Sequence, residues 1–167
     1  MFKFLSVTLL FPAALLSGCR TVSTSVKTEF SHFVGIDDFS NSSRSQNERG
    51  ETERGETILL SPEIKPGIPW NELIVSWNAE APPGTFLKVE ASAVSAGRAT
   101  KFYDLGNWSP DNEAFPRVSL GYQKDADGSV LTDTLALTHP ADAVRIRVTL
   151  GGIDGARPRL NLKTAVE

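Results

Sequence analysis

The sequence predicts an all-β fold: an antiparallel β-sandwich of the jelly-roll-like kind, following a cleaved lipoprotein signal peptide. The main observation is that short segments between residues 58 and 167 alternate apolar and polar side chains, the period of a strand with one buried face. Turn signals such as APPG and DADG separate these segments at intervals of about 8 to 15 residues. No window shows a sustained helical period, so two packed sheets, each with one solvated face, are favoured.

The individual strands follow from this alternation. The clearest segment is Phe86–Val94, in which Leu87, Val89, Ala91 and Ala93 share one face while polar residues dominate the other. The other expected strands are Ile58–Leu60, Glu72–Trp77, Lys101–Leu105, Val118–Tyr122, Val130–Leu137, Val144–Leu150 and Leu160–Thr164.

The N-terminus has the pattern of an export signal. Lys3 precedes an apolar run of about a dozen residues, which is too short to cross a bilayer of about 30 Å as a helix. The string LSGC, ending at Cys19, resembles a bacterial lipobox. That resemblance implies that Cys19 becomes the new N-terminus and carries acyl chains such as palmitate, two or more of which anchor a protein stably. An ordinary signal peptide with a chance cysteine is the other interpretation.

The predicted organisation follows from this signal. It comprises a signal peptide at 1–18, a tether at 19–29, an upstream segment with a first strand and a polar loop at 30–57, and a β-sandwich domain at 58–167. The polar loop contains the tandem copy ERGETERGET, Glu48–Thr57, which is either a binding repeat or a small duplication tolerated in an exposed loop; two copies favour the duplication. Arg20 is not the aspartate associated with inner-membrane retention, so we expect the cell envelope, and the outer membrane in a Gram-negative cell.

The sequence offers little catalytic chemistry. Its two histidines are His32 and His139, and we expect His139 to lie at a turn between strands, because Pro140 follows it. The patterns HExxH, C-x-x-C and GxSxG do not occur, and an acylated Cys19 can be neither a nucleophile nor a metal ligand. The formal net charge of −3 gives no reason to expect nucleic acid as a partner. We therefore expect a protein without a cofactor that is not an enzyme.

Asp125 and Asp127 form a weak candidate metal site. Two carboxylates around a turn can bind calcium through oxygen, but the calcium-loop pattern is incomplete here. The alternative, which we favour, is a hairpin turn in which Asp127-Gly128 supplies a positive φ.

Aromatic residues are the candidate ligand-binding groups. Aromatic faces on a β-sandwich can stack on sugar rings, but they also fill the cores of small domains. Trp77 follows Leu73 and Val75 at period two, so we expect it in the core. Trp108 lies near a strand end and, together with Tyr103, is the candidate for exposure and for ligand binding.

Four segments carry a family resemblance: ELIVSWNA (Glu72–Ala79), PPGT (Pro82–Thr85), LGNWS (Leu105–Ser109) and DGSVLTDTL (Asp127–Leu135). They resemble the N-terminal β-sandwich module that precedes the papain-like domain in bacterial bacteriocin-processing-like (double-glycine-type) cysteine peptidases. The resemblance implies the sandwich fold and an accessory role. It carries over no catalytic residue, because the chain contains no catalytic cysteine and histidine pair.

Three functions remain open. We expect a membrane-anchored envelope lipoprotein whose non-catalytic β-sandwich is an accessory or binding module for a glycan or a protein. The alternative is the detached N-terminal portion of a secreted papain-like cysteine peptidase that needs a separate catalytic chain. A third possibility is a structural or vestigial lipoprotein.

Overall fold

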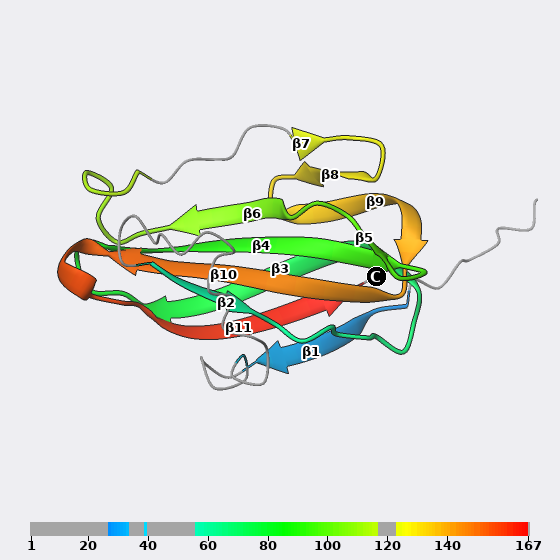
Figure 1. Ribbon diagram of the computed structural model, residues 1–167, viewed down its shortest axis with the longest axis horizontal. Coiled ribbons are helices and arrows are strands. Elements are labelled where there is room, and N and C mark those ends of the chain that lie inside the picture. The colour runs from blue at the N-terminus through cyan, green and yellow to red at the C-terminus, as the bar shows by residue number, and fades with distance from the viewer. Residues whose placement is uncertain (1–26, 34–38, 40–55, 117–122, 167) are drawn as a thin grey trace, which may run out of the picture.

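The computed structural model describes residues 27–33, 39, 56–116 and 123–166, and for 30–33 and 160–166 it describes the backbone alone. The described chain forms two packed antiparallel sheets with almost no helix, which confirms the predicted all-β sandwich (Figure 1). The signal peptide, Cys19, most of the tandem repeat and the strand expected at Val118–Tyr122 lie outside the described residues. In the part of the chain that is described, no helix has the length and hydropathy that a membrane crossing requires.

The described strands divide between the two sheets. Six form one sheet in the order β1 (Glu29–Phe33), β11 (Arg159–Val166), β3 (Trp70–Glu80), β9 (Thr134–Ala141), β8 (Gly128–Leu131) and β7 (Gln123–Lys124). The other sheet has the order β2 (Thr57–Leu60), β10 (Ala143–Gly152), β4 (Thr85–Ser95) and β5 (Arg98–Ala99), and β6 (Tyr103–Trp108) also pairs with β4.

The core lies between the sheets, where the alternation places it. Leu87, Val89, Ala91 and Ala93 of β4 are all at most 2% exposed, as predicted. They belong to one buried cluster with inward residues of β3, β9 and β10. Burial of each large aliphatic side chain stabilises the fold by about 1.5–3 kcal/mol, so this interior is the main source of stability.

Three local expectations are wrong. The segment Val130–Leu137 is two strands, because the chain reverses between Leu131 and Thr134, with Thr132 at φ 60°. His139 lies within β9, in a stretch where β9 has extra residues relative to β3, rather than in a turn between strands. Gly128 does not have a positive φ. Its need for glycine is steric, since a Cβ there would lie 2.6 Å from the backbone oxygen of Ala136.

The sandwich takes in residues upstream of the boundary predicted at 58. Strand β1 pairs along β11 from Glu29↔Val166 to Phe33↔Leu162, and Phe39 is 2% exposed in the core. The first strand expected upstream of residue 58 is therefore part of the sandwich.

The outer face of the five-stranded sheet is more covered than expected. Glu90 and Ser92 point away from the core, yet they are 6% and 1% exposed. The hydroxyl of Ser92 donates to the carbonyl of Thr100, and the Arg147 guanidinium pairs with Glu90 while lying 4.1 Å from the Phe102 ring centre. The expectation of a solvated face fails here because side chains of neighbouring strands and loops fold over β4.

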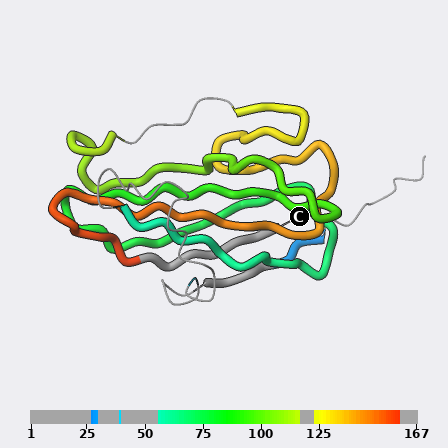
Figure 2. The backbone as a smooth tube through the Cα atoms, viewed as in Figure 1, coloured from blue at the N-terminus to red at the C-terminus, as the bar shows by residue number. Residues whose placement is uncertain are grey.

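The strand registers place the start of β1 and the end of β11 at the same end of the sandwich. Glu29 pairs with Val166, and the same end of the sandwich contains Trp70, paired with Ala141, and the turn after Ser95. In Figures 1 and 2 this is the right-hand end, marked by the C-terminus. The opposite end carries the 3₁₀ turn Ile153–Gly155.

Candidate functional site

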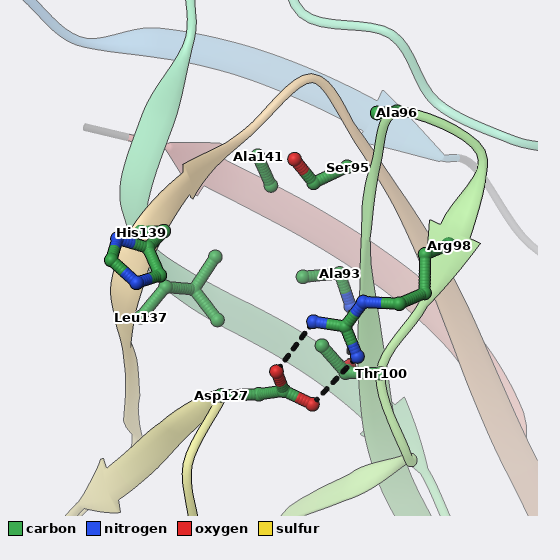
Figure 3. A pocket seen from close by; sticks show the side chains of 9 residues that line it. All are labelled: Ala93, Ser95, Ala96, Arg98, Thr100, Asp127, Leu137, His139 and Ala141. Carbon is green, nitrogen blue, oxygen red and sulfur yellow. Dashed lines mark hydrogen bonds and ion pairs between the residues drawn. The ribbon is translucent and has the colours of Figure 1, made fainter.

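A pocket of about 370 Å³ lies at the end of the sandwich where Glu29 pairs with Val166 (Figure 3). Its residues come from both sheets. They are Ala93, Ser95, Ala96, Arg98, Thr100, Asp127, Leu137, His139 and Ala141. This volume is at the lower end of the range of small-molecule and side-chain binding pockets.

The pocket exists because small residues end the core here. Ala93 faces inward from β4 and Ala141 is buried at the end of β9, so neither fills the space between the sheets. Leu137 is only partly buried, and His139 stands exposed on the irregular stretch of β9. The result is an apolar floor beneath a polar rim.

One ion pair spans the rim. The two terminal nitrogens of Arg98 donate to the two carboxylate oxygens of Asp127 at 3.1 and 2.5 Å, as the dashed lines in Figure 3 show. The guanidinium holds the pKa of Asp127 below its usual range, and the carboxylate raises the pKa of Arg98. The pair joins β5 of one sheet to the β7–β8 turn of the other.

A second set of contacts, made to Asp125, holds the same turn. The hydroxyl of Tyr103 donates to Asp125 Oδ1 at 2.6 Å, and the backbone N–H groups of Asp127 and Gly128 donate to the same oxygen. Lys101 Nζ lies 2.8 Å from Asp125 Oδ2. These donors, Lys101 first, lower the pKa of Asp125, while burial and the carboxylate raise the pKa of Tyr103.

These contacts bear on the candidate metal site. The oxygens of Asp125 and Asp127 already accept hydrogen bonds from Lys101, Tyr103 and Arg98. Among the described residues, no group of three or more His, Cys, Asp or Glu side chains could hold a metal ion. The two carboxylates therefore hold the turn in place, and a metal cation would have to displace the side chains of Lys101 and Arg98.

The side chain of Gln123 in β7 binds the backbone of β6 next to this turn. Its side-chain oxygen accepts from the backbone N–H of Asp104 at 3.0 Å, and its side-chain nitrogen donates to the carbonyl of Asp104 at 2.7 Å. The amide thus takes the place of a strand neighbour at this point of the β6 edge. It ties β7 to the opposite sheet and blocks edge pairing there.

The structure separates the two aromatic candidates from the pocket. Tyr103 is 0% exposed, so its ring offers no face to a ligand, and Lys101 lies over that ring at 4.9 Å. Trp108 is half-buried and packs against the core. Trp77 is also half-buried against the core, and it fits closely over Gly106, where a Cβ would lie 2.8 Å from its ring.

A charged cluster covers the outer face of the five-stranded sheet. Arg147 donates twice to Glu90 at 2.7 Å, and Lys88 lies 3.1 and 3.0 Å from Glu90 and Asp104. Burial opposes charge at Glu90, but the bonds to Arg147 and Lys88 outweigh it and lower the pKa of Glu90. Burial raises the pKa of Asp104, and the bonds to Lys88 only partly offset it. Both carboxylates are engaged in ion pairs.

Among the described residues that line the pocket, no hydrogen-bonded nucleophile–base pair is present. In the described part of the chain, no hydrogen bond joins His139 to a serine or a carboxylate, and Asp127 is engaged by Arg98. The Ser95 hydroxyl donates to the carbonyl of Pro140 at 3.4 Å. The arrangement can bind an apolar group and contact its polar surroundings. The sequence analysis did not identify Arg98, Ala93 or Ala141 as pocket residues. The Ala96-Gly97 pair is a turn signal that indicates the end of the strand beside the pocket.

The Tyr103–Asp125 contact yields a test by pH. We expect Tyr103→Phe to lower the free energy of unfolding at pH 7 by about 1–2 kcal/mol, the value of a hydrogen bond to a partly exposed charged group. The lowered pKa of Asp125 gives stability above its ordinary value of 3.8 that is lost as pH falls. The raised pKa of Tyr103 gives stability that is lost as pH rises beyond 10.0.

The difference between wild type and variant is therefore largest between these two pH values and shrinks on either side. Urea unfolding from pH 3 to pH 11 measures it. A difference that stays constant across that range would show that the hydroxyl does not interact with the carboxylate.

Comparison with known families agrees with this architecture. A family model described as the Peptidase C39 N-terminal domain matches residues 16–166, which include every described strand. No curated protein and no solved structure shows significant similarity to the chain. The match covers far more than half of the sequence and supports an accessory module of a peptidase-related protein. The chain belongs to the Peptidase C39 N-terminal domain family.

Proposed function

We propose that the chain is a lipid-anchored, non-catalytic module of the bacterial cell envelope that binds a protein partner and serves a peptidase. The observation that carries the proposal is that several carboxylates of the described surface are engaged in ion pairs. Asp125, Asp127 and Glu90 are each held by one or more cationic side chains. Such pairs stabilise a surface and define its shape, and these three carboxylates are therefore engaged in ion pairs rather than held as free bases.

A protein ligand fits the described surface better than a glycan does. Sugar binding on a sandwich relies on exposed aromatic faces. Here Trp70 and Tyr103 are 0% exposed, and Trp77 and Trp108 pack against the core. No Phe, Tyr or Trp lines the pocket at the end of the sandwich. An apolar floor with a polar rim is instead the pattern of a protein-binding surface.

The tether sets how far the sandwich stands from the membrane. The nine residues from Cys19 to Lys27 are joined by eight Cα–Cα steps, which span at most about 28 Å when fully extended. Strand β1 begins next to the last residues of β11, so a lipid on Cys19 would keep the pocket end of the sandwich facing the bilayer. This orientation is part of the proposal.

The alternative function is the N-terminal portion of a papain-like cysteine peptidase that works with a separate catalytic chain. The family description, an N-terminal domain of a peptidase, favours a peptidase as the eventual partner in either case. The two candidates differ in whether the module acts as an anchored binder or as a subunit needed for activity.

Mass spectrometry of the protein purified from membranes tests the anchor. We expect the mature N-terminus to be Cys19 and to carry a mass increment of two or three acyl chains. Cys19→Ser should release the folded protein from the membrane fraction. A membrane-extracted protein with an unmodified thiol would contradict the anchor and leave the binding module intact as a proposal.

Retention on polysaccharide tests the choice between protein and glycan. We expect neither wild type nor Trp108→Ala to be retained on peptidoglycan or other cell-wall polysaccharide. Trp108→Ala should instead lower the free energy of unfolding by about 1–3 kcal/mol, because a half-buried aromatic leaves the core. Phe102→Ala is the matched control, a second half-buried aromatic that lies against Arg147. Retention of wild type that Trp108→Ala alone abolishes, at unchanged stability, would favour a glycan.

A further inference from the structure

We propose that Asp154 is a site of spontaneous covalent modification, at which the Asp154-Gly155 peptide of the folded protein rearranges to an isoaspartyl linkage. The dipeptide Asp-Gly occurs twice in the sequence, at Asp127-Gly128 and at Asp154-Gly155. Glycine favours this rearrangement because it has no side chain to hinder attack by its amide nitrogen. The fold leaves one of the two copies open to reaction and holds the other in place. This inference is independent of the proposed function.

The reaction needs water and no other partner. The amide nitrogen of Gly155 attacks Cγ of the protonated Asp154 carboxyl group. A C–N bond forms, the amide proton and the hydroxyl group leave as water, and a five-membered succinimide ring results. Water then adds to one of the two ring carbonyls, and the C–N bond at that carbonyl breaks. Addition at the former main-chain carbonyl leaves the chain running through the side chain, so the backbone gains one methylene group and the total mass is unchanged.

The first argument is that the surroundings of Asp154 and Gly155 are open. Both residues are exposed, in the turn that joins β10 to β11 at the left-hand end of Figure 1. A Cβ built on Gly155 would meet no atom within 4 Å beyond its chain neighbours. Among the described residues, the Asp154 carboxylate has no hydrogen-bond donor and no ion-pair partner. No described contact therefore holds this carboxyl group away from the amide nitrogen that must attack it.

The second argument is that the backbone of this turn can rearrange at low cost. The 3₁₀ turn Ile153–Gly155 contains three residues, and the N–H of Ala156 closes it on the carbonyl of Ile153 at 3.2 Å. Asp154 has a φ of 55° and Gly155 a φ of 78°, both in the left-handed region, which is sparsely populated by residues other than glycine. Bringing the Gly155 nitrogen to Cγ requires the peptide between the two residues to rotate. In so short a turn, that rotation breaks few hydrogen bonds.

The other Asp-Gly pair is a matched comparison within the same chain. Arg98 donates to both carboxylate oxygens of Asp127. The N–H of Gly128, the group that would have to attack, donates to Asp125 Oδ1 at 3.1 Å, and Gly128 is buried in β8. The ion pair also holds the pKa of Asp127 below its usual range, so the protonated carboxyl group that loses water is scarcer. Reaction at Asp127 therefore requires these contacts to break first.

The rearrangement changes a connection between the two sheets. Strand β10 lies in the five-stranded sheet and β11 in the six-stranded sheet, so the turn at Asp154 links them. Directly before the reacting peptide, the N–H of Ile153 donates to the carbonyl of Gly84 at 2.9 Å. An added backbone methylene group displaces the residues around this bond. The modification therefore alters the end of the sandwich opposite the pocket.

Incubation of the purified full chain in heavy-oxygen water tests the proposal. Each succinimide that opens takes up one oxygen from the solvent, and fragment masses of the digested protein locate this label and the isoaspartate. In the folded protein we expect label at Asp154 to exceed label at Asp127 about tenfold or more, because breaking a hydrogen bond to a charged group costs about that factor in rate. In guanidinium chloride the two pairs are the same unfolded dipeptide, so their labelling should become similar.

The matched control is Asp154→Glu, which keeps the carboxylate but could close only a six-membered ring. It should remove the label at position 154 and leave the label at Asp127 in guanidinium chloride unchanged. Equal labelling of the two pairs in the folded protein, or label at position 154 that persists in Asp154→Glu, would overturn the proposal. Absence of label at Asp154 in the folded protein would overturn it as well, whatever the result in guanidinium chloride.

Discussion

The hydrogen bond between Tyr103 and Asp125 is the interaction on which the pocket end of this sandwich depends. Tyr103 lies on β6 of one sheet with its ring fully buried, and Asp125 begins the turn between β7 and β8 of the other sheet. A buried hydroxyl needs a partner, so the ring can occupy the core only if the turn comes to meet it. Asp125 in turn accepts from the backbone of the turn, which places Asp127 where Arg98 can bind it.

This constraint connects stability to function. The contacts that join the two sheets also form the rim of the pocket, so the charged side chains of Arg98 and Asp127 are engaged in holding the surface together. The pocket is then a shaped and nearly neutral opening into the core, lying where the chain enters and leaves the sandwich. The chain that carries this opening belongs to a peptidase-associated family.

The sequence alone predicted the fold class and most of the core, because alternation along β4 and β10 reports directly which side chains are buried. It could not predict the pocket. Ala93 and Ala141 look like ordinary core residues in their own strands, and they meet in one pocket only because the two sheets pack together. Tyr103 was a candidate for ligand binding because aromatic faces can stack on sugars, and the sequence did not indicate its burial because its acceptor, Asp125, is distant in the chain. The reversal at Thr132 was missed because it uses a β-branched residue at positive φ, where turns usually have glycine.

A double-mutant cycle on Tyr103 and Asp125 tests the central claim most directly. The free energies of unfolding of wild type, Tyr103→Phe, Asp125→Ala and the double variant are compared at pH 7. If the hydroxyl–carboxylate bond joins the sheets, the double variant is more stable than the sum of the two single losses implies, by about 1 kcal/mol or more. Losses that add to within about 0.3 kcal/mol would contradict the account, because the two residues would then act independently.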